Sequence, residues 1–416
     1  MKILADRGIP RVAEVFGRLG EVRLFEPPRP EPRQLRHCEL LLVRSVTRVG
    51  PGLLEGSRVR LVGTATSGVD HLDTAGLEAA GISWFSARGC NARPVAEYVL
   101  SALSLLSLRQ GTPLRGATAA LVGCGRVGSC LAGLLEAVGV RCLRNDPPLQ
   151  ERFGGDYLSL DEVLEADIVS LHVPLTRSGP HPTWKLLDAA RLRRMKPGAV
   201  LINTARGGVA DEAALAERLR AGRLTAVLDV WEGEPEIDWE LLRLAALGTP
   251  HIAGYSRAAK RRATSLLYRR LCRRLCLSPA EPPSAPAPPS PPPAFLPPPG
   301  TAPGEALRRC ILAAYDIGAD ARALRGLSQL PPPQRGGAFQ ALRDRYPLRP
   351  EFADLRPRPG SAPLPAALRA PLRALGFALG DAPAAGVAAA PPRGVDAGAG
   401  AAAGAAAGAA AGAGAW

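Results

Sequence analysis

Three short segments in the middle of the sequence carry side chains that could act together on a hydroxy acid. They are "NTARGG" with Arg206, "DVWEGEPE" with Glu234 and "PHIAGYS" with His251. An imidazole can take up or release a proton near neutral pH, and a guanidinium pairs with a carboxylate through two hydrogen bonds. A carboxylate beside the imidazole fixes its tautomer and stabilises its protonated form. These are the groups that hydride transfer to or from a 2-hydroxy acid requires.

Taken singly, each residue has a plainer explanation, because most histidines, arginines and loop acids have structural or solvated roles. A glycine motif upstream reverses that judgement. Gly123, Gly125 and Gly128 in "LVGCGRVG" form a G-x-G-x-x-G pattern between an apolar strand and a helix. Such glycines allow a tight turn and a close approach to a pyrophosphate. The pattern predicts a dinucleotide site.

The type of dinucleotide is indicated by Asp146, which lies 18 residues after the last glycine of the motif, at the end of the next predicted strand. A carboxylate there can accept hydrogen bonds from a ribose 2′-hydroxyl and would repel a 2′-phosphate, which favours NAD over NADP. The nearby Arg144 weakens this preference.

Apolar runs alternate with amphipathic stretches along most of the chain, which is typical of parallel α/β units. The segment "ARPVAEYVLSALSLLSL" predicts a long buried helix between two such regions, and "RAAKRRATSLLYRRLCRRLC" predicts a basic helix with one apolar face. Because distant strand ends meet along one edge of a doubly wound sheet, Arg206, Glu234 and His251 can converge there.

Composition excludes several classes of protein. The net charge is +14, but no nucleic-acid-binding motif accompanies it, so we expect no nucleic-acid partner. The eight cysteines form no C-x-x-C pair, and the N-terminus has no apolar run typical of a signal peptide. We therefore expect a cytoplasmic protein with no membrane segment.

Several motifs together resemble the D-isomer-specific 2-hydroxyacid dehydrogenases over roughly the first 280 residues. They include "GCGRVG", "INTARGGVADEAAL", "LDVWEGEPE" and "PHIAGYS". Other motifs, among them "LLVRSVTRV", "VGTATSGVDHLD" and "FQALRDRYPLRPEF", are similar to the branch of the family that oxidises 4-phosphoerythronate in vitamin B6 synthesis.

The resemblance implies two doubly wound, Rossmann-like parallel-sheet domains and a small C-terminal α/β dimerisation domain. Residues 1–95, with 256–277 returning to them, would bind substrate, and 96–255 would bind NAD. A Pro-rich linker (278–303) would lead to the dimerisation domain (304–380) and a low-complexity Ala/Gly tail (381–416). The implied assembly is a homodimer.

The resemblance also implies roles for individual residues. Arg206 and Glu234 would be active-site residues and His251 the proton donor. The substrate, a small phosphorylated 2-hydroxy acid, would contact Ser45, Thr66 and Tyr255. Arg44 is a further candidate for its phosphate on chemical grounds alone, because it is a donor on the same strand-end loops as Ser45 and Thr66. The implied NAD contacts are Gly123, Gly125, Arg126, Val127, Gly128, Asp146, Val173, Asp229 and Gly254.

One residue departs from the pattern, since Val173 stands where similar family members carry Thr. We expect NAD affinity to be weaker by one neutral hydrogen bond, about 0.5–1.5 kcal/mol. Two other functions stay open at this point: a general D-2-hydroxyacid dehydrogenase of the phosphoglycerate or hydroxypyruvate type, and an NAD-sensing regulatory protein.

Overall fold

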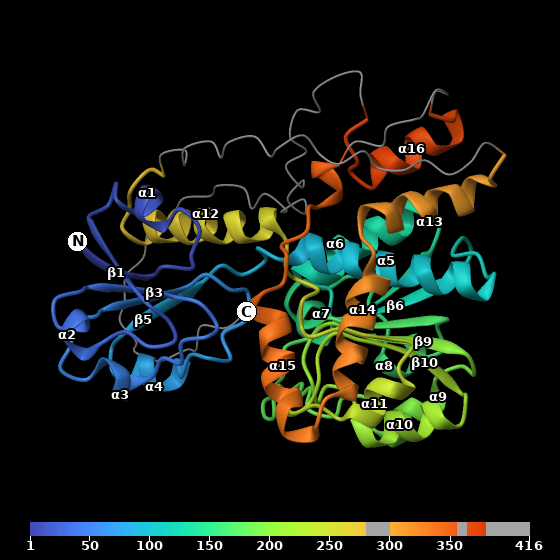
Figure 1. The fold of residues 1–416 in the computed structure, drawn as a ribbon, viewed down its shortest axis with the longest axis horizontal. Helices are drawn as coiled ribbons and strands as arrows, with labels where there is room; N and C mark the ends of the chain where they lie inside the picture. The colour runs from blue at the N-terminus through green and yellow to red at the C-terminus, as the bar shows by residue number, and fades with distance from the viewer. Residues whose placement is uncertain (280–299, 356–363, 380–416) are drawn as a thin grey trace, which may run out of the picture. The chain divides into compact units, whose positions relative to one another are not determined.

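Two parallel sheets form the framework of the chain in the computed structural model (Figure 1). The first sheet has the strand order β2-β1-β3-β4-β5. Its strands are β1 (Lys2–Asp6), β2 (Glu21–Phe25), β3 (Leu40–Val43), β4 (Leu61–Thr64) and β5 (Ser83–Ser86). All four residues of β3 are buried, as expected for the centre of a parallel sheet covered on both faces.

Short helices and one long helix cover the first sheet. They are α1 (Val12–Phe16), α2 (Pro32–Leu35), α3 (Pro51–Leu54), α4 (Thr74–Ala79) and α12 (Arg257–Arg274). Helix α12 is the predicted basic helix, and its apolar face is confirmed: Leu267, Tyr268 and Leu271 are buried in one core with Ile3 and Phe16. The chain therefore returns to the first sheet after completing the second.

The second sheet has the order β11-β10-β9-β8-β6-β7, and all its strands are parallel. Its strands are β6 (Thr118–Val122), β7 (Arg141–Asn145), β8 (Ile168–Leu171), β9 (Ala199–Asn203), β10 (Leu224–Leu228) and β11 (Leu247–Gly248). The chain moves outward from β6 to β7 and then returns to β8 on the other side of β6. This reversal opens a crevice at the carboxyl ends of β6 and β8, where ligands bind in such sheets.

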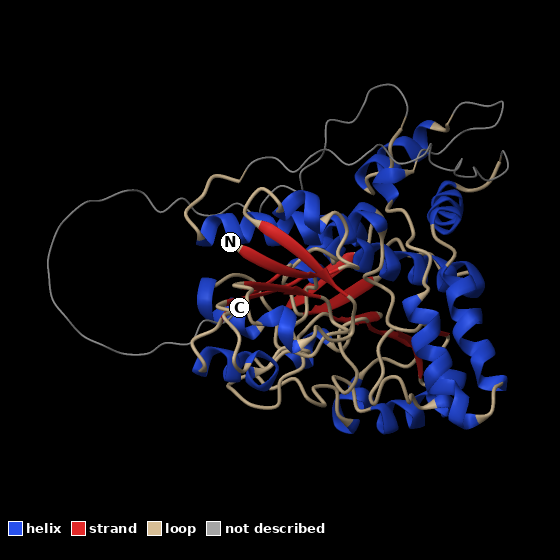
Figure 2. Cartoon of the chain, turned by 60° about the vertical axis from the view of Figure 1, so that its left-hand side comes forward, coloured by secondary structure: helices blue, strands red, loops and turns tan. Residues whose placement is uncertain are grey.

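Helices lie on both faces of the second sheet (Figures 1 and 2). The helices are α5 (Ala92–Gln110), α6 (Arg126–Ala137), α7 (Pro147–Phe153), α8 (Leu160–Val163), α9 (Ala189–Arg194), α10 (Glu212–Arg220) and α11 (Trp239–Leu244). Helix α5 confirms the predicted long buried helix, since 13 of its 19 residues are buried. It packs with α6 against one face, while α9, α10 and α11 cover the other. The two predicted parallel-sheet α/β domains are thus confirmed as a fold class.

The described part of the C-terminal segment is helical, which corrects the prediction of an α/β domain there. Its elements are α13 (Pro303–Ala314), α14 (Ile317–Gly326), η1 (Leu327–Gln329), α15 (Pro332–Asp344), η2 (Phe352–Asp354) and α16 (Ala366–Ala374), with no strand within 300–355 and 364–379. The buried side chains of this segment join the cores on the two faces of the second sheet, as Ile311 and Phe339 illustrate. These helices need no sheet of their own, because their apolar side chains are buried in the cores that cover the second sheet.

The structure describes residues 1–279, 300–355 and 364–379. Most of the predicted Pro-rich linker and the whole predicted Ala/Gly tail lie outside these ranges. Within the ranges, no helix is both long enough and apolar enough to cross a bilayer.

Candidate active site

The glycine motif forms the turn between β6 and α6. Gly123 has a φ of 94°, and a side chain there would lie 2.7 Å from the carbonyl oxygen of His172. A side chain at Gly128 would meet the Gly123 carbonyl oxygen at 2.1 Å. At Gly125, in contrast, a Cβ would have no described atom within 4 Å. Two glycines are therefore required for packing, while the middle one leaves the backbone open to a pyrophosphate at the N-terminus of α6.

The other predicted residues of this turn line its two sides. Arg126 and Val127 are the first two residues of α6; Arg126 is exposed and Val127 packs against the core. Val173 is half-buried, with Cγ1 3.0 Å from where a Cβ on Gly123 would lie. Because its side chain has no polar atom, it supplies no hydrogen bond to a cofactor.

Asp146 follows β7 and ties the glycine turn to the next helix. Its carboxylate accepts hydrogen bonds from the backbone N–H groups of Cys124 at 2.7 Å and Leu149 at 3.1 Å. These two bonds fix the carboxylate beside the turn. Each carboxylate oxygen has lone pairs left over, which a ribose hydroxyl can use.

Arg206 follows β9 in a turn built by Asn203. The Asn203 amide donates to the Arg206 carbonyl oxygen at 2.9 Å and accepts from the Ala205 N–H at 3.0 Å. The guanidinium donates through Nε and Nη2 to Asp70 Oδ2, at 3.0 and 2.7 Å. The Asp70 side chain is 62% exposed; crowding by its neighbours raises its pKa by partial desolvation, but Arg206 outweighs this and the pKa is lowered overall. Arg206 thus already holds a carboxylate, which comes from the loop after β4.

Glu234 and His251 lie side by side after β10 and β11. His251 Nδ1 is 2.8 Å from Glu234 Oε2, and the other oxygen of Glu234 accepts the Trp231 N–H at 2.9 Å. Burial raises the pKa of Glu234, but His251 and these hydrogen bonds lower it by a larger amount. The net pKa is below its ordinary value, so the carboxylate stays ionised. An ionised carboxylate can only accept, so Nδ1 carries a proton and Nε2 is left for a substrate. The backbone of His251 is left-handed, with a φ of 57°.

Asp229 holds the loop on which His251 lies. Its buried carboxylate accepts from the Thr249 hydroxyl at 2.6 Å and from the N–H groups of Ile252 and Ala253 at 2.8 and 2.9 Å. The Tyr98 hydroxyl lies 2.6 Å from Thr249 Oγ1 and extends this network to α5. Burial raises the pKa of Asp229, although His251 and the donors oppose it. In this structure the Asp229 carboxylate therefore accepts its hydrogen bonds from groups of the protein.

The predicted substrate residues lie at the ends of strands β3 and β4 and beside His251. Ser45 is exposed, whereas the Thr66 hydroxyl donates to the Gly68 carbonyl oxygen at 2.8 Å. Arg44, next to Ser45, pairs with the buried carboxylate of Asp6 at 3.0 Å. The Tyr255 hydroxyl lies 3.3 Å from Arg343 Nε.

Two polar atoms bear on whether a nicotinamide fits. Asn91 Oδ1 and Thr204 Oγ1 are buried without a hydrogen-bond partner among the described residues. Asn91 lies against Gly254, where a Cβ would be 2.8 Å from its Nδ2. Buried polar atoms normally have partners, and a carboxamide supplies both donors and acceptors. Together with the open backbone at Gly125, these residues fit NAD.

Several residues of the site were not predicted from the sequence, among them Asp70, Asn203, Thr249 and Arg343. Asp70 and Asn203 lie within quoted motifs, "VGTATSGVDHLD" and "INTARGGVADEAAL", so their positions carried a signal that was not used. Thr249 precedes "PHIAGYS" by one residue. Arg343 also lies within a quoted motif, "FQALRDRYPLRPEF", but it is about 90 residues from Tyr255 along the chain, and no local pattern indicates their contact.

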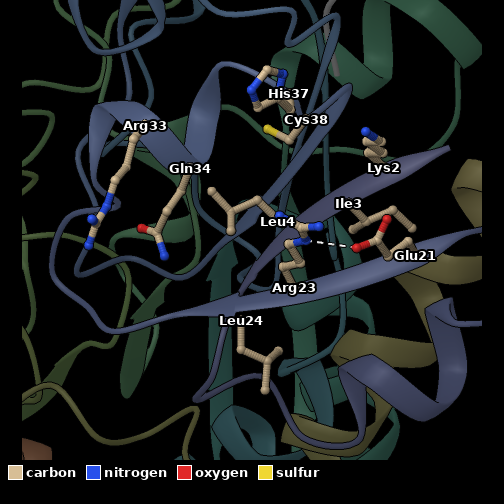
Figure 3. Close-up of a pocket in the computed structure, with 10 residues that line it drawn as sticks. All are labelled: Lys2, Ile3, Leu4, Glu21, Arg23, Leu24, Arg33, Gln34, His37 and Cys38. Carbon is tan, nitrogen blue, oxygen red and sulfur yellow. Dashed lines mark hydrogen bonds and ion pairs between the residues drawn. The ribbon is translucent and has the colours of Figure 1, made fainter.

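A separate pocket lies at the edge of the first sheet, where strands β1 and β2 meet α2 (Figure 3). An ion pair between Arg23 and Glu21, 2.7 Å long, crosses its wall. Its lining includes none of the predicted site residues. The candidate active site is therefore defined by side-chain geometry and not by this pocket.

Comparison with known proteins places this geometry in a family. Residues 104–253 match the model for the D-isomer specific 2-hydroxyacid dehydrogenase, NAD binding domain. The erythronate-4-phosphate dehydrogenase of Chromohalobacter salexigens is 46% identical over 359 residues, which are 86% of this chain and 93% of that protein. The protein of the same name from Salmonella typhimurium is 44% identical over 365 residues, 85% of this chain and 93% of its own length.

The chain belongs to the D-isomer-specific 2-hydroxyacid dehydrogenases, in the erythronate-4-phosphate dehydrogenase branch. It is an oxidoreductase of this family, and its cofactor is NAD. Among solved structures, the D-lactate dehydrogenase of Aquifex aeolicus complexed with NAD and lactic acid is 26% identical, with a TM-score of 0.55. The match covers 66% of this chain and 96% of that one. The family resemblance stated from sequence motifs is confirmed.

Proposed function

We propose that this dehydrogenase oxidises 4-phosphoerythronate to 3-hydroxy-2-oxo-4-phosphonooxybutanoate with NAD, in the synthesis of pyridoxal 5′-phosphate. The observation that carries the proposal is the 2.8 Å contact between His251 Nδ1 and the ionised Glu234, which leaves a basic nitrogen facing away from the carboxylate. The name shared by its relatives at 44–46% identity supports this substrate.

In the proposed reaction His251 Nε2 removes the proton from the C2 hydroxyl. Glu234 stabilises the imidazolium that forms, and Arg206 pairs with the substrate carboxylate, exchanging part of its contact with Asp70. The glycine turn and Asp146 would hold NAD, which would supply the acceptor for the hydride from C2. Asp229 acts by fixing the His251 loop, so that the imidazole meets the hydroxyl in one orientation.

The remaining residues are proposed to bind the two ligands. Ser45, Thr66 and Tyr255 would contact the hydroxy acid, with Arg44 near its phosphate; the glycine turn, Asp146, Val173 and Gly254 would contact NAD. In this division residues 1–95 and 256–277 form the substrate-binding domain and 96–255 the NAD-binding domain. We also propose a cytoplasmic homodimer in which residues 304–380 contribute to dimerisation.

The test is an assay of the purified full-length chain with NAD and 4-phosphoerythronate, following NADH at 340 nm. We expect turnover with this substrate and at least tenfold lower kcat/KM with 3-phosphoglycerate or glycerate. A parallel arm with an added 2-oxo acid shows whether NADH is reoxidised while bound, because turnover would then exceed the NADH that accumulates.

Each alternative function has its own outcome in the same assay. Equal activity on glycerate and 4-phosphoerythronate would indicate a general D-2-hydroxyacid dehydrogenase. Tight NADH binding without turnover on any 2-hydroxy acid would indicate a regulatory protein instead.

A further inference from the structure

The C-terminal segment is anchored directly to the loop that carries His251 and Tyr255. Arg349, which is 7% exposed, donates through Nη2 to the Ala253 carbonyl oxygen at 2.9 Å and through Nη1 to the Tyr255 carbonyl oxygen at 3.3 Å. The Arg257 N–H donates to the Arg349 carbonyl oxygen at 3.1 Å. Backbone contacts of this kind fix the position of the preceding helix, α15, relative to the site.

One side chain from the last turn of α15 enters the site itself. Arg343 Nε donates to the Tyr255 hydroxyl at 3.3 Å, and Nη1 lies 3.9 Å from Glu234 Oε2. The side chains of Arg343 and Glu234 are 20% and 18% exposed. Both contacts of Arg343 are longer than the 2.8 Å contact between His251 and Glu234. The guanidinium is therefore placed between a substrate residue and the catalytic pair without displacing the histidine.

We propose that Arg343 is a positioning residue of the active site, which orients the Tyr255 hydroxyl and offsets the negative charge of Glu234 beside His251. The C-terminal segment then completes the catalytic site, in addition to any part in dimerisation. The inference about Tyr255 rests on the proposed function, whereas the electrostatic effect on His251 does not depend on the substrate.

The sign of that effect follows from the charges around His251. Glu234 contacts the imidazole, and buried Asp229 lies behind its loop; both favour the protonated form. Arg343 approaches Glu234 from α15. Glu212 faces Glu234 from α10, but burial and the neighbouring acids raise its pKa to about 7, so it adds its full negative charge only above neutral pH. Lys260 of α12 lies over the Tyr255 ring, 4.4 Å from its centroid. Removing the charge of Arg343 should therefore make the imidazole hold its proton to higher pH.

Two substitutions separate the two roles. Arg343→Gln removes both the positive charge and the planar guanidinium. We expect KM for the hydroxy acid to rise about tenfold, because the Tyr255 hydroxyl is no longer oriented. The acidic limb of kcat/KM for oxidation should move to higher pH by about half a pH unit, because the charge is lost. Arg343→Lys keeps the charge but not the planar fork. It should raise KM while leaving the pH profile near that of the wild type. Arg345→Gln, an exposed change of equal charge two residues away, is the matched control.

A second readout needs no substrate. The titration of the His251 imidazole, followed by NMR in histidine-labelled full-length protein and assigned with His251→Gln, should have its midpoint raised by about half a pH unit in Arg343→Gln. This shift would persist even if 4-phosphoerythronate proved not to be the substrate. An Arg343→Gln variant whose KM and imidazole midpoint match those of Arg345→Gln would overturn the proposal.

Discussion

The site contains two pairs of a carboxylate and a basic side chain, Asp70 with Arg206 and Glu234 with His251, which have almost the same contact distance but different surroundings. Arg206 meets Asp70 at 2.7 Å and His251 meets Glu234 at 2.8 Å, and the side chains of Arg206 and His251 are 30% and 29% exposed. The acids differ, because Asp70 is 62% exposed and Glu234 only 18%. Distance alone therefore does not separate the two pairs; the accessibility of the acid does.

The difference has a structural cause. Glu234 is held by the Trp231 N–H, and the loop of its partner His251 is held by Asp229. Asp70 lies on a loop of the first sheet and contacts Arg206, which follows a strand of the second sheet. The Asp70 side chain remains mostly exposed to solvent. A pair with an exposed acid contributes little free energy and exchanges readily. We infer that the Arg206 pair can open for a substrate carboxylate, while the His251 pair stays closed throughout the reaction.

The largest effect is expected when either basic side chain, His251 or Arg206, is removed. His251→Ala and Arg206→Ala should each lower kcat/KM about 10³-fold, because general acid–base catalysis and carboxylate binding both fail. NADH binding, measured by fluorescence titration, should change little, since neither side chain belongs to the glycine turn. Activity within tenfold of the wild type in either variant would remove that residue from the mechanism.

Glu234→Gln tests whether the closed pair sets the proton affinity of His251. The pKa of Glu234 is lowered below its ordinary 4.5, so its charge is present throughout the neutral range and favours the protonated imidazole. Without that charge the imidazole loses its proton at lower pH. Both the acidic limb of oxidation and the alkaline limb of reduction should therefore move to lower pH, with kcat/KM reduced about 10- to 100-fold. Unmoved limbs would contradict the role of Glu234.

Asp229→Asn tests whether the hydrogen bonds of Asp229 keep the His251 loop in place and so maintain the contact between His251 and Glu234. The Asn side chain can accept only part of the hydrogen bonds that the buried carboxylate accepts, so the free energy of unfolding should fall by about 1–3 kcal/mol. Urea unfolding measures this loss. A kcat that fell without any loss of stability would instead indicate direct contact with the reacting groups.

Asp70→Asn should have the smallest effect. Removing the charge of an exposed partner should change the free energy of unfolding by less than about 1 kcal/mol. KM for the hydroxy acid should fall about two- to threefold, because the substrate carboxylate no longer competes with a charged Asp70 for Arg206. A KM that rose tenfold would mean that Asp70 positions Arg206, and the contrast between the two pairs would fail.

The sequence was most informative where the chemistry is local. The glycine turn, the long helix over Ala92–Gln110 and the return helix over Arg257–Arg274 follow from periodicity and turn residues. At the C-terminus the resemblance implied an α/β domain, whereas residues 300–355 and 364–379 form helices whose buried side chains join the cores of the second sheet. A short amphipathic stretch does not show which core it will join. Arg343 was missed for the same reason: its contacts with Tyr255 and Glu234 arise from tertiary packing across about 90 to 110 residues of chain.

The left-handed backbone of His251 bears on protein engineering. At a φ of 57°, a residue with a Cβ costs about 1 kcal/mol relative to glycine. A selection for heat resistance that did not monitor turnover would accordingly favour His251→Gly over His251→Ala, and neither residue has a side chain that can transfer the proton. At this position the requirement of the reaction and the preference of the backbone oppose each other, so stabilising libraries of this enzyme should leave His251 fixed.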